Sequence, residues 1–400
     1  MKRLTSVLLL LFVLFSALPL TASAADETVT INVYNWGQYI ADGTDGYIDI
    51  IDEFEKAYPN IKVNYMTFDS NESMYTKLKT GGSSFDIIFP SDYMVEKLIA
   101  EDMLEPLDFE NIPNAALLDD SFRNPSYDPE GRYSVPYTWG CVGIIYNTQY
   151  VNKADVTGWE LLWNPTYAGK ILMFDNPRDA FAIAQFEEGL DINAEDPEDL
   201  AVAAEKLRQE KNLVQAYVMD QIFDKMERGE AWIAPYYAGD YLYMVQENPD
   251  LAFYLPEEGF NLFVDAICVP KGSEHKKEAE LFINFLISPE ICGENLDYLG
   301  YSSPYSAAKE YMDPEIAGNP VAYPDEETLA RGKSFSALSE EGTQKMNELW
   351  LAVKTADAST TFYLILTGVA IVAVVFLWVF FKVRKRRRKA RRCQKWHTKP

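Results

Sequence analysis

The chain has 400 residues and is acidic, with 61 Asp and Glu against 36 Lys and Arg and a net charge of −25. Its two histidines are His275 and His397, and it contains neither His-Glu-x-x-His, Gly-x-Ser-x-Gly nor a phosphate-binding glycine loop. These features disfavour an enzyme. The four cysteines do not make a disulfide framework. The negative charge disfavours nucleic acid as a partner.

Residues 1–24 are typical of a secretory signal peptide. Lys2 and Arg3 precede an apolar run, and residues 22–24 (Ala-Ser-Ala) match the small-x-small cleavage pattern. A retained first transmembrane helix is the weaker alternative, because the apolar run is short for a span. We therefore expect the mature protein to be exported.

The alternation of apolar residues in the mature chain predicts an α/β fold. Helices are expected from Tyr47, from Asn71 as an N-cap, and at 179–188, 200–208 and 219–228. Strands are expected at 29–33, 61–65, 85–89, 143–146, 171–174, 232–235 and 266–269. The alternating order predicts a parallel sheet with helices on both faces.

The exported part is too long for one typical core, so two lobes are expected. The chain is expected to cross between them near 136–140 and near 263–265. A cleft between two such lobes can close on a ligand by hinge motion. Lobe 1 is predicted at 27–139 with 265–309, and lobe 2 at 140–264 with 310–355.

Residues 362–381 are predicted to form a transmembrane helix, joined to the lobes by a linker at 356–361. No charged residue occurs from Ala358 to Phe381, and about 20 helical residues match a hydrocarbon core of roughly 30 Å. The basic tail at 382–400 is then cytoplasmic by the positive-inside rule, although so basic a run could also bind nucleic acid. We expect a single-pass protein on the extracytoplasmic face of the cell membrane, with its N-terminus outside.

The segment Tyr34-Asn35-Trp36-Gly37-Gln38-Tyr39 follows the first predicted strand. Side chains at the carboxyl end of such a strand project into the crevice where ligands bind. Indole and phenol rings there suit an alkyl chain that bears positive charge. The alternative is that these aromatic residues only cover the end of a core strand.

From 29 to about 353, the chain resembles the extracytoplasmic polyamine-binding proteins that serve spermidine/putrescine ABC importers. The resemblance rests on several motifs in order: Tyr-Asn-Trp-Gly-Gln-Tyr at 34–39, Ser-Asn-Glu-Ser-Met-Tyr-Thr-Lys-Leu-Lys at 70–79, Phe-Pro-Ser-Asp-Tyr-Met-Val at 89–95, Val-Pro-Tyr-Thr-Trp-Gly at 135–140, Trp-Asn-Pro-Thr-Tyr-Ala-Gly-Lys at 163–170, Leu-Gly-Tyr-Ser-Ser-Pro at 299–304 and Tyr-Pro-Asp-Glu-Glu-Thr at 323–328. It implies a type II periplasmic-binding-protein fold, two α/β lobes with the ligand in the cleft between them.

The resemblance also implies a ligand site without metal or cofactor. Asp179 and Asp265 would pair with the ammonium groups of a polyamine, because an unpaired buried charge is very costly. The methylene groups would pack on Trp36, Tyr237 and Phe263. The full set of implied ligand-binding residues is Trp36, Tyr39, Ser91, Tyr93, Asn176, Asp179, Tyr237, Phe263, Asp265 and Tyr301.

Some positions depart from the family pattern. Gly37 stands where a hydroxyl residue is common, Phe335 where an amide is common, and Tyr237 and Phe263 where Trp is found. Asn176 replaces one of two acids, which leaves the preferred amine open. The acids that could substitute are Asp175, Asp92 and Asp240.

We therefore expect a membrane-tethered, monomeric substrate-binding component that delivers spermidine or putrescine to ABC permease subunits with a cytoplasmic ATPase. Three alternatives stay open. The chain could be the ligand-binding ectodomain of a receptor, or a binder of the same fold for another small cation. An extracellular hydrolase is disfavoured by the shortage of histidine.

Overall fold

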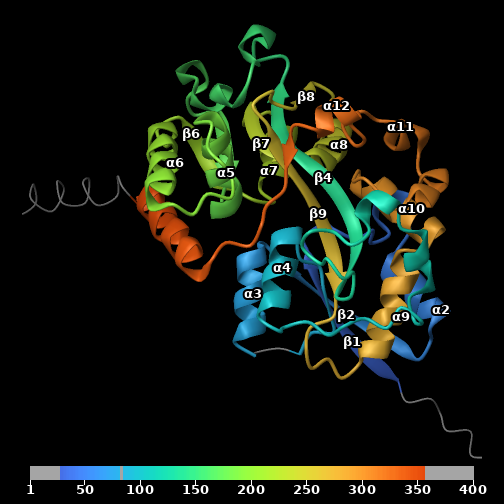
Figure 1. Ribbon diagram of the computed structural model, residues 1–400. Helices are drawn as coiled ribbons and strands as arrows, with labels where there is room; N and C mark the ends of the chain where they lie inside the picture. Colours follow the sequence, from blue (N-terminus) through green and yellow to red (C-terminus); the bar gives the residue numbers. More distant parts are fainter. Residues whose placement is uncertain (1–27, 82–83, 356–400) are drawn as a thin grey trace, which may run out of the picture.

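The computed structural model describes residues 28–81 and 84–355 of the chain (Figure 1). The predicted signal peptide, linker, transmembrane helix and basic tail lie outside these ranges. Within the ranges, no helix is long and apolar enough to cross a membrane.

Ten strands of the described residues form one connected sheet, in the order β2-β1-β3-β9-β4-β7-β5-β6, with β8 added to β4 and β10 to β9. Their bounds are β1 Val29–Trp36, β2 Ile61–Phe68, β3 Ile87–Ile88, β4 Ser134–Asn147, β5 Ile171–Phe174, β6 Val214–Val218, β7 Ile233–Tyr237, β8 Leu251–Tyr254, β9 Phe260–Cys268 and β10 Gly332–Lys333. The expected parallel pairing is found for β1 with β2 and β3 and for β5 with β6 and β7. It is wrong for β4, which pairs antiparallel with β7, β8 and β9.

Strands β4 and β9 pass through both halves of the molecule. Residues Ser134–Cys141 of β4 pair with β9, and from Val142 onward β4 pairs with β7. In Figure 1 these strands rise between a lower half with β1, β2 and α9 and an upper half with β5 to β8. The predicted crossings at 136–140 and 263–265 thus lie inside long strands, and the predicted strands at 143–146 and 266–269 are only their ends.

Pro136 explains why β4 was predicted to be shorter. Proline has no backbone N–H to donate, so its presence argues against a central strand. The structure accommodates it at a register shift between Pro136 and Thr138, where one residue drops out of the ladder with β9. The change of partner at Val142 is close to the predicted lobe boundary at 139/140, and the lobe assignment itself stays a prediction.

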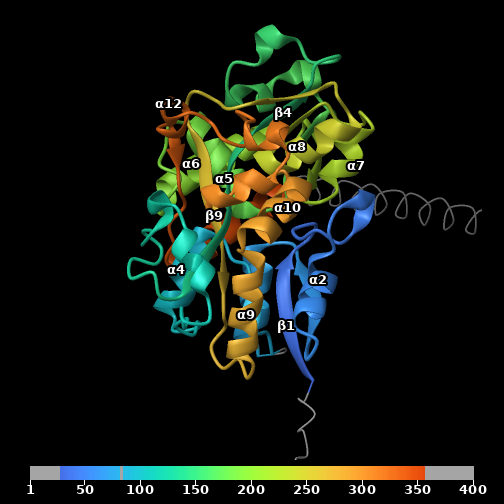
Figure 2. The same cartoon turned by 90° about the vertical axis from the view of Figure 1, so that its right-hand side faces the viewer.

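Helices cover the sheet on opposite sides. In the lower half, α3 and α4 lie on one side of β1 and β2, while α2 and α9 lie on the other, and the turned view in Figure 2 agrees. The bounds are α2 Ile50–Ala57, α3 Asn71–Lys79, α4 Asp92–Ala100, α5 Pro177–Glu187, α6 Pro197–Glu210, α7 Ile222–Glu227, α8 Ala238–Glu247, α9 Lys276–Leu286, α10 Pro289–Leu299, α11 Pro314–Ala317 and α12 Glu326–Leu329. Residues 340–355 are also helical.

Glu210, the last residue of α6, is a buried acid. It is 0% exposed, and neither carboxyl oxygen accepts a hydrogen bond from a described residue. Burial alone raises the pKa of Glu210 well above its usual value. In the unfolded chain this carboxyl ionises at about pH 4.3. In the folded protein it keeps its proton to a higher pH, so folding stability is lost as the pH rises above that value.

We expect Glu210→Gln to stabilise the fold at pH 7, by about 1–3 kcal/mol, because glutamine has no charge to suppress. The gain should shrink toward pH 4, where the wild-type carboxyl is protonated in both states. Thermal unfolding at both pH values measures it. The control is Glu205→Gln, which removes a 59% exposed carboxylate from the same helix. An unchanged or lower melting temperature at pH 7 would contradict the expectation.

Candidate functional site

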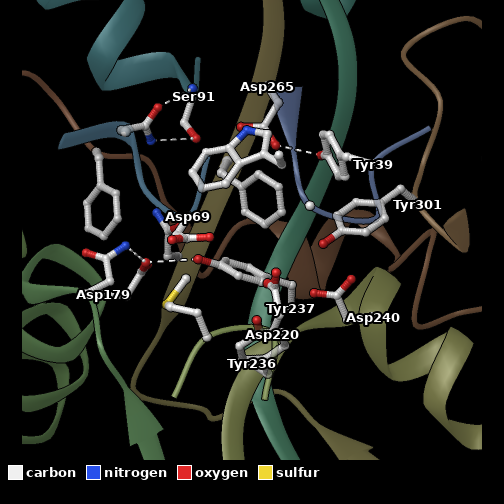
Figure 3. A pocket seen from close by; sticks show the side chains of 18 of the residues that line it. Tyr39, Asp69, Ser91, Asp179, Asp220, Tyr236, Tyr237, Asp240, Asp265 and Tyr301 are labelled. Atoms are coloured by element: carbon white, nitrogen blue, oxygen red, sulfur yellow. Dashed lines mark hydrogen bonds between the residues drawn. The ribbon is translucent and has the colours of Figure 1, made fainter. Parts of the chain in front are cut away.

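One cavity of about 730 Å³ lies where the two halves meet, and all ten predicted site residues line it (Figure 3). They come from the end of β1 and the loop after it, from the N-caps and first turns of α4 and α5, from the end of β7, from the middle of β9 and from the loop after α10. The fold therefore brings together the ten residues that the resemblance implies. Whether each of them contacts a ligand stays a prediction.

The wall of the cavity combines acids with aromatic rings. Six aspartates and nine aromatic residues line it, and its lining includes no Lys, Arg or His. Such a surface attracts cations and repels anions. The acids are Asp69, Asp92, Asp179, Asp220, Asp240 and Asp265.

Asp265 projects from β9 and is 5% exposed. Its Oδ2 accepts a hydrogen bond of 2.6 Å from the Tyr39 hydroxyl, which lies 2.5 Å from Thr138 Oγ1. Because Tyr39 gives its only proton to Asp265, Thr138 must donate to Tyr39. Oδ1 of Asp265 accepts no hydrogen bond from a described residue. Burial raises the pKa of Asp265 to about 6, against the lowering effect of the nearby Ser91 and Tyr39 hydroxyls.

Asp179 lies in the first turn of α5, where the helix dipole favours negative charge. Its Oδ2 accepts hydrogen bonds from Asn176 Nδ2 at 2.7 Å and from the Tyr237 hydroxyl at 3.0 Å, so Oδ1 can accept from a ligand. Burial raises the pKa of Asp179 to about 7. Asn176 is also the N-cap of α5, because its Oδ1 accepts from the Arg178 amide at 2.9 Å. The side-chain amide of Asn176 therefore fixes the orientation of the Asp179 carboxylate.

Asn71 does not cap α3, contrary to the expectation. Ser70 is the N-cap, in a capping box with Ser73, and Asn71 is the first helical residue. Its amide instead donates to Ser91 Oγ at 3.0 Å and to the Tyr93 hydroxyl at 3.1 Å. Asn71 therefore positions two predicted site residues and lines the cavity itself.

Trp36 is held in one orientation by its indole nitrogen, which donates to the Phe89 carbonyl at 2.8 Å. The donor is thus used by the protein, and the ring face remains for a ligand. Tyr34, two residues earlier, is buried and stacks on Phe85. Tyr34 belongs to the core and Trp36 to the cavity wall, and a contact between Trp36 and a ligand stays a prediction.

The remaining aromatic residues pack edge to face around the cavity. Phe263 contacts Tyr237 at 5.4 Å between ring centroids, and Tyr301 contacts Tyr39 at 5.1 Å. Tyr301 lies against Gly239 of α8, where a Cβ atom would come within 2.2 Å of its ring. A side chain at position 239 would therefore displace Tyr301.

Two of the three suggested substitute acids line the cavity. Burial raises the pKa of Asp92 and that of Asp240 to about 8, and in both cases neighbouring carboxylates add to the rise. Figure 3 shows Asp240 beside Tyr301. Asp175 does not reach the cavity; it pairs with Lys354 at 2.5 Å on the surface, so its suggested role is wrong.

The sequence analysis missed Asp69, Asp220 and Tyr236, which also line the cavity. Asp69 directly follows β2 and Asp220 lies just beyond β6. Their positions just after strands could have indicated that they line the cleft, as the position of Trp36 did. Tyr236 carries no such signal, because it is an ordinary aromatic residue inside β7.

The chain is similar to known proteins over most of its length. The spermidine/putrescine-binding periplasmic protein of Escherichia coli K12 is 32% identical over 337 residues, which cover 82% of this chain and 95% of that protein. The putrescine-binding periplasmic protein SpuD of Pseudomonas aeruginosa is 29% identical and covers 89% of this chain and 99% of its own.

A solved structure shows the same architecture. The spermidine/putrescine ABC transporter substrate-binding protein PotD of Streptococcus pneumoniae superposes with a TM-score of 0.68 and 34% identity, over 82% of this chain and 98% of that one. The fold is therefore the α/β periplasmic-binding-protein fold. Residues 49–323 match the family model of bacterial extracellular solute-binding proteins, and the chain belongs to that family.

Proposed function

We propose that the protein captures a polyamine in the cleft and delivers it to the permease of an ABC importer. The observation that carries the proposal is the cavity wall, which has six aspartates and nine aromatic residues but no basic residue. The relatives named for spermidine and putrescine favour the same ligand class. In this proposal the protein binds and releases its ligand without turnover.

The ammonium and methylene groups of a polyamine match the carboxylates and aromatic rings of the cavity wall. Asp179 and Asp265 each keep a carboxyl oxygen for a ligand and come from opposite parts of the cavity. A charge-assisted hydrogen bond to such an oxygen contributes roughly 1.5–3 kcal/mol. Between the acids, the rings of Trp36, Tyr237 and Phe263 offer apolar surface to methylene groups and negative faces to ammonium groups.

Closure around the ligand follows from the origin of these residues. Trp36 comes from β1 in one half, and Asp179 and Tyr237 come from α5 and β7 in the other. A cation that contacts all of them holds the halves together. We propose that binding favours the closed form, and that the closed form is the one the permease recognises.

The first prediction concerns Asp265. Asp265→Asn keeps an oxygen for the Tyr39 hydroxyl but removes the charge, and should weaken polyamine binding roughly 10- to 100-fold. Isothermal titration calorimetry of the purified full-length protein with putrescine, spermidine and spermine measures this. Asp120→Asn, at a 99% exposed side chain outside the cavity, is the control for net charge. Full affinity in Asp265→Asn would remove Asp265 from the site.

Binding should also depend on pH. With pKa values raised to about 6 for Asp265, 7 for Asp179 and 8 for Asp240, part of the carboxyl groups hold protons near pH 7. An ammonium ligand favours the ionised carboxylates, so binding releases protons and affinity falls as the pH drops from 8 to 6, by about tenfold or more. Calorimetry in two buffers of different ionisation enthalpy counts the protons. No proton release, with constant affinity, would contradict the expectation.

We further propose that the segment at 362–381 tethers the protein to the membrane beside its permease. A tether raises the effective concentration of the binder without new contacts. A chain that ends after Thr355 keeps every residue of the cavity wall, so it should bind polyamine with unchanged affinity. Uptake of labelled polyamine by cells should nevertheless slow. Equal uptake with the tethered and the released protein, at equal expression, would exclude the tether.

A further inference from the structure

A second cavity, of about 720 Å³, lies behind one wall of the cavity described above, and Tyr93 lines both. Its other walls come from α3 and α4 in the lower half, from the first turn of α5 in the upper half, and from residues 337–347. In Figure 1, α3 and α4 lie below α5. The volume is typical of a small-molecule site, and the proposed function makes no use of it.

Arg178 brings a buried charged donor to the second cavity. The residue is 3% exposed, and its guanidinium lies 4.3 Å from the centre of the Phe335 ring. Nη1 donates to the Ile192 carbonyl at 3.1 Å, and Nη2 donates to Asn193 Oδ1 at 2.7 Å and to the Ser336 carbonyl at 3.1 Å. The Nε–H group is also buried and has no acceptor among the described residues. A buried donor without an acceptor is costly, and more so when it is charged.

Glu72 brings a carboxylate with one open position. Its Oε1 accepts a hydrogen bond of 2.9 Å from the Tyr93 hydroxyl. Its Oε2 is buried and accepts none from residues 28–81 and 84–355. Glu72 and Arg178 are not hydrogen-bonded to each other, although the negative charge of Glu72 opposes the lowering of the Arg178 pKa by burial. The lining therefore holds two opposite charges, each with one buried atom that lacks a partner.

Most of the remaining lining is apolar. Lys97 adds a further charge, but its Nζ lies 3.7 Å from a Glu101 carboxyl oxygen and 4.8 Å from the centre of the Tyr75 ring, so this charge is already compensated. A matching ligand has an anionic acceptor for Arg178, a cationic donor for Glu72 and an apolar body. The apolar and aromatic side chains that would contact this body are Tyr75, Met94, Pro177, Ala337, Leu338 and Met346.

We propose that the second cavity binds a small zwitterion, of the class of an amino acid with an apolar side chain. Its carboxylate accepts from Nε of Arg178, its ammonium group donates to Oε2 of Glu72, and its side chain packs on the apolar lining. Both contacts are charge-assisted hydrogen bonds, and each satisfies a group that the fold leaves open. A polyamine does not match this cavity, because it has no acceptor for Arg178. The inference goes beyond the proposed function and does not depend on it.

The test is calorimetric titration of the purified, ligand-free, full-length protein with L-leucine, L-methionine and L-phenylalanine, each alone. Glycine and 4-methylpentanoate are the comparison compounds, since glycine lacks the apolar side chain and 4-methylpentanoate lacks the ammonium group. We expect at least one of the three amino acids to bind. Both comparison compounds should bind more weakly than that amino acid, by about tenfold or more.

Two variants locate the binding. Glu72→Gln keeps a carbonyl oxygen for the Tyr93 hydroxyl but removes the charge, and should weaken amino-acid binding by about tenfold or more. Thr343→Trp fills the cavity from the helix at 340–355 and should abolish the binding. Gln344→Trp is the matched control, because Gln344 is exposed and does not line the cavity. Thermal unfolding of each variant shows whether the fold is intact.

The results separate this site from the polyamine cavity. Amino-acid binding that is lost in Glu72→Gln and Thr343→Trp but kept in Gln344→Trp supports the second site. If none of the three amino acids binds to the folded wild type, the site is overturned, and water satisfies the open groups. Binding that both cavity variants retain places the amino acid elsewhere and also overturns the site. Titration of the wild type with spermidine and putrescine tests the proposed function separately, and its failure would leave the second site standing.

Discussion

The negative charge around the cavity is the constraint on which the site depends. A buried carboxylate without a cation is costly, and the wall of this cavity brings six aspartates together without a basic residue. The protein limits the cost with hydroxyl and amide donors, as Tyr39 does for Asp265 and Asn176 does for Asp179. Burial meets the rest by raising the pKa values of Asp179 and Asp265 to about 7 and about 6, which favours their protonated forms near neutral pH.

The same constraint explains why Asn176 is compatible with the site. A second acid beside Asp179 would add repulsion that only a ligand could relieve. The amide instead donates to Asp179 and caps α5, so it orders the carboxylate before any ligand arrives. In the proposed function, the ligand would meet one preorganised carboxylate at this end rather than two competing ones.

Much of the fold could be predicted from the sequence because it depends on local patterns. The alternation in β1 and β2, the buried run of β5 and the turn residues between elements are short-range signals. The continuous β4 could not be predicted, because its ladder with β9 and β7 joins residues far apart in the chain and tolerates Pro136 at a register shift. For the site, the 34–39 motif pointed to Trp36, and the resemblance to polyamine-binding proteins pointed to Asp265. That Asp69 and Asp220 line the same cavity depends on how the two halves meet, which no local pattern encodes.

The two long strands have a consequence for how the molecule resists damage. All 14 residues of β4 are buried, and its ladder is shared by both halves. Neither half keeps its central strand if the other unravels, so the described domain should open as one cooperative unit rather than half by half. A ligand held between the halves then protects the entire unit, including surfaces it never touches, against proteases outside the cell.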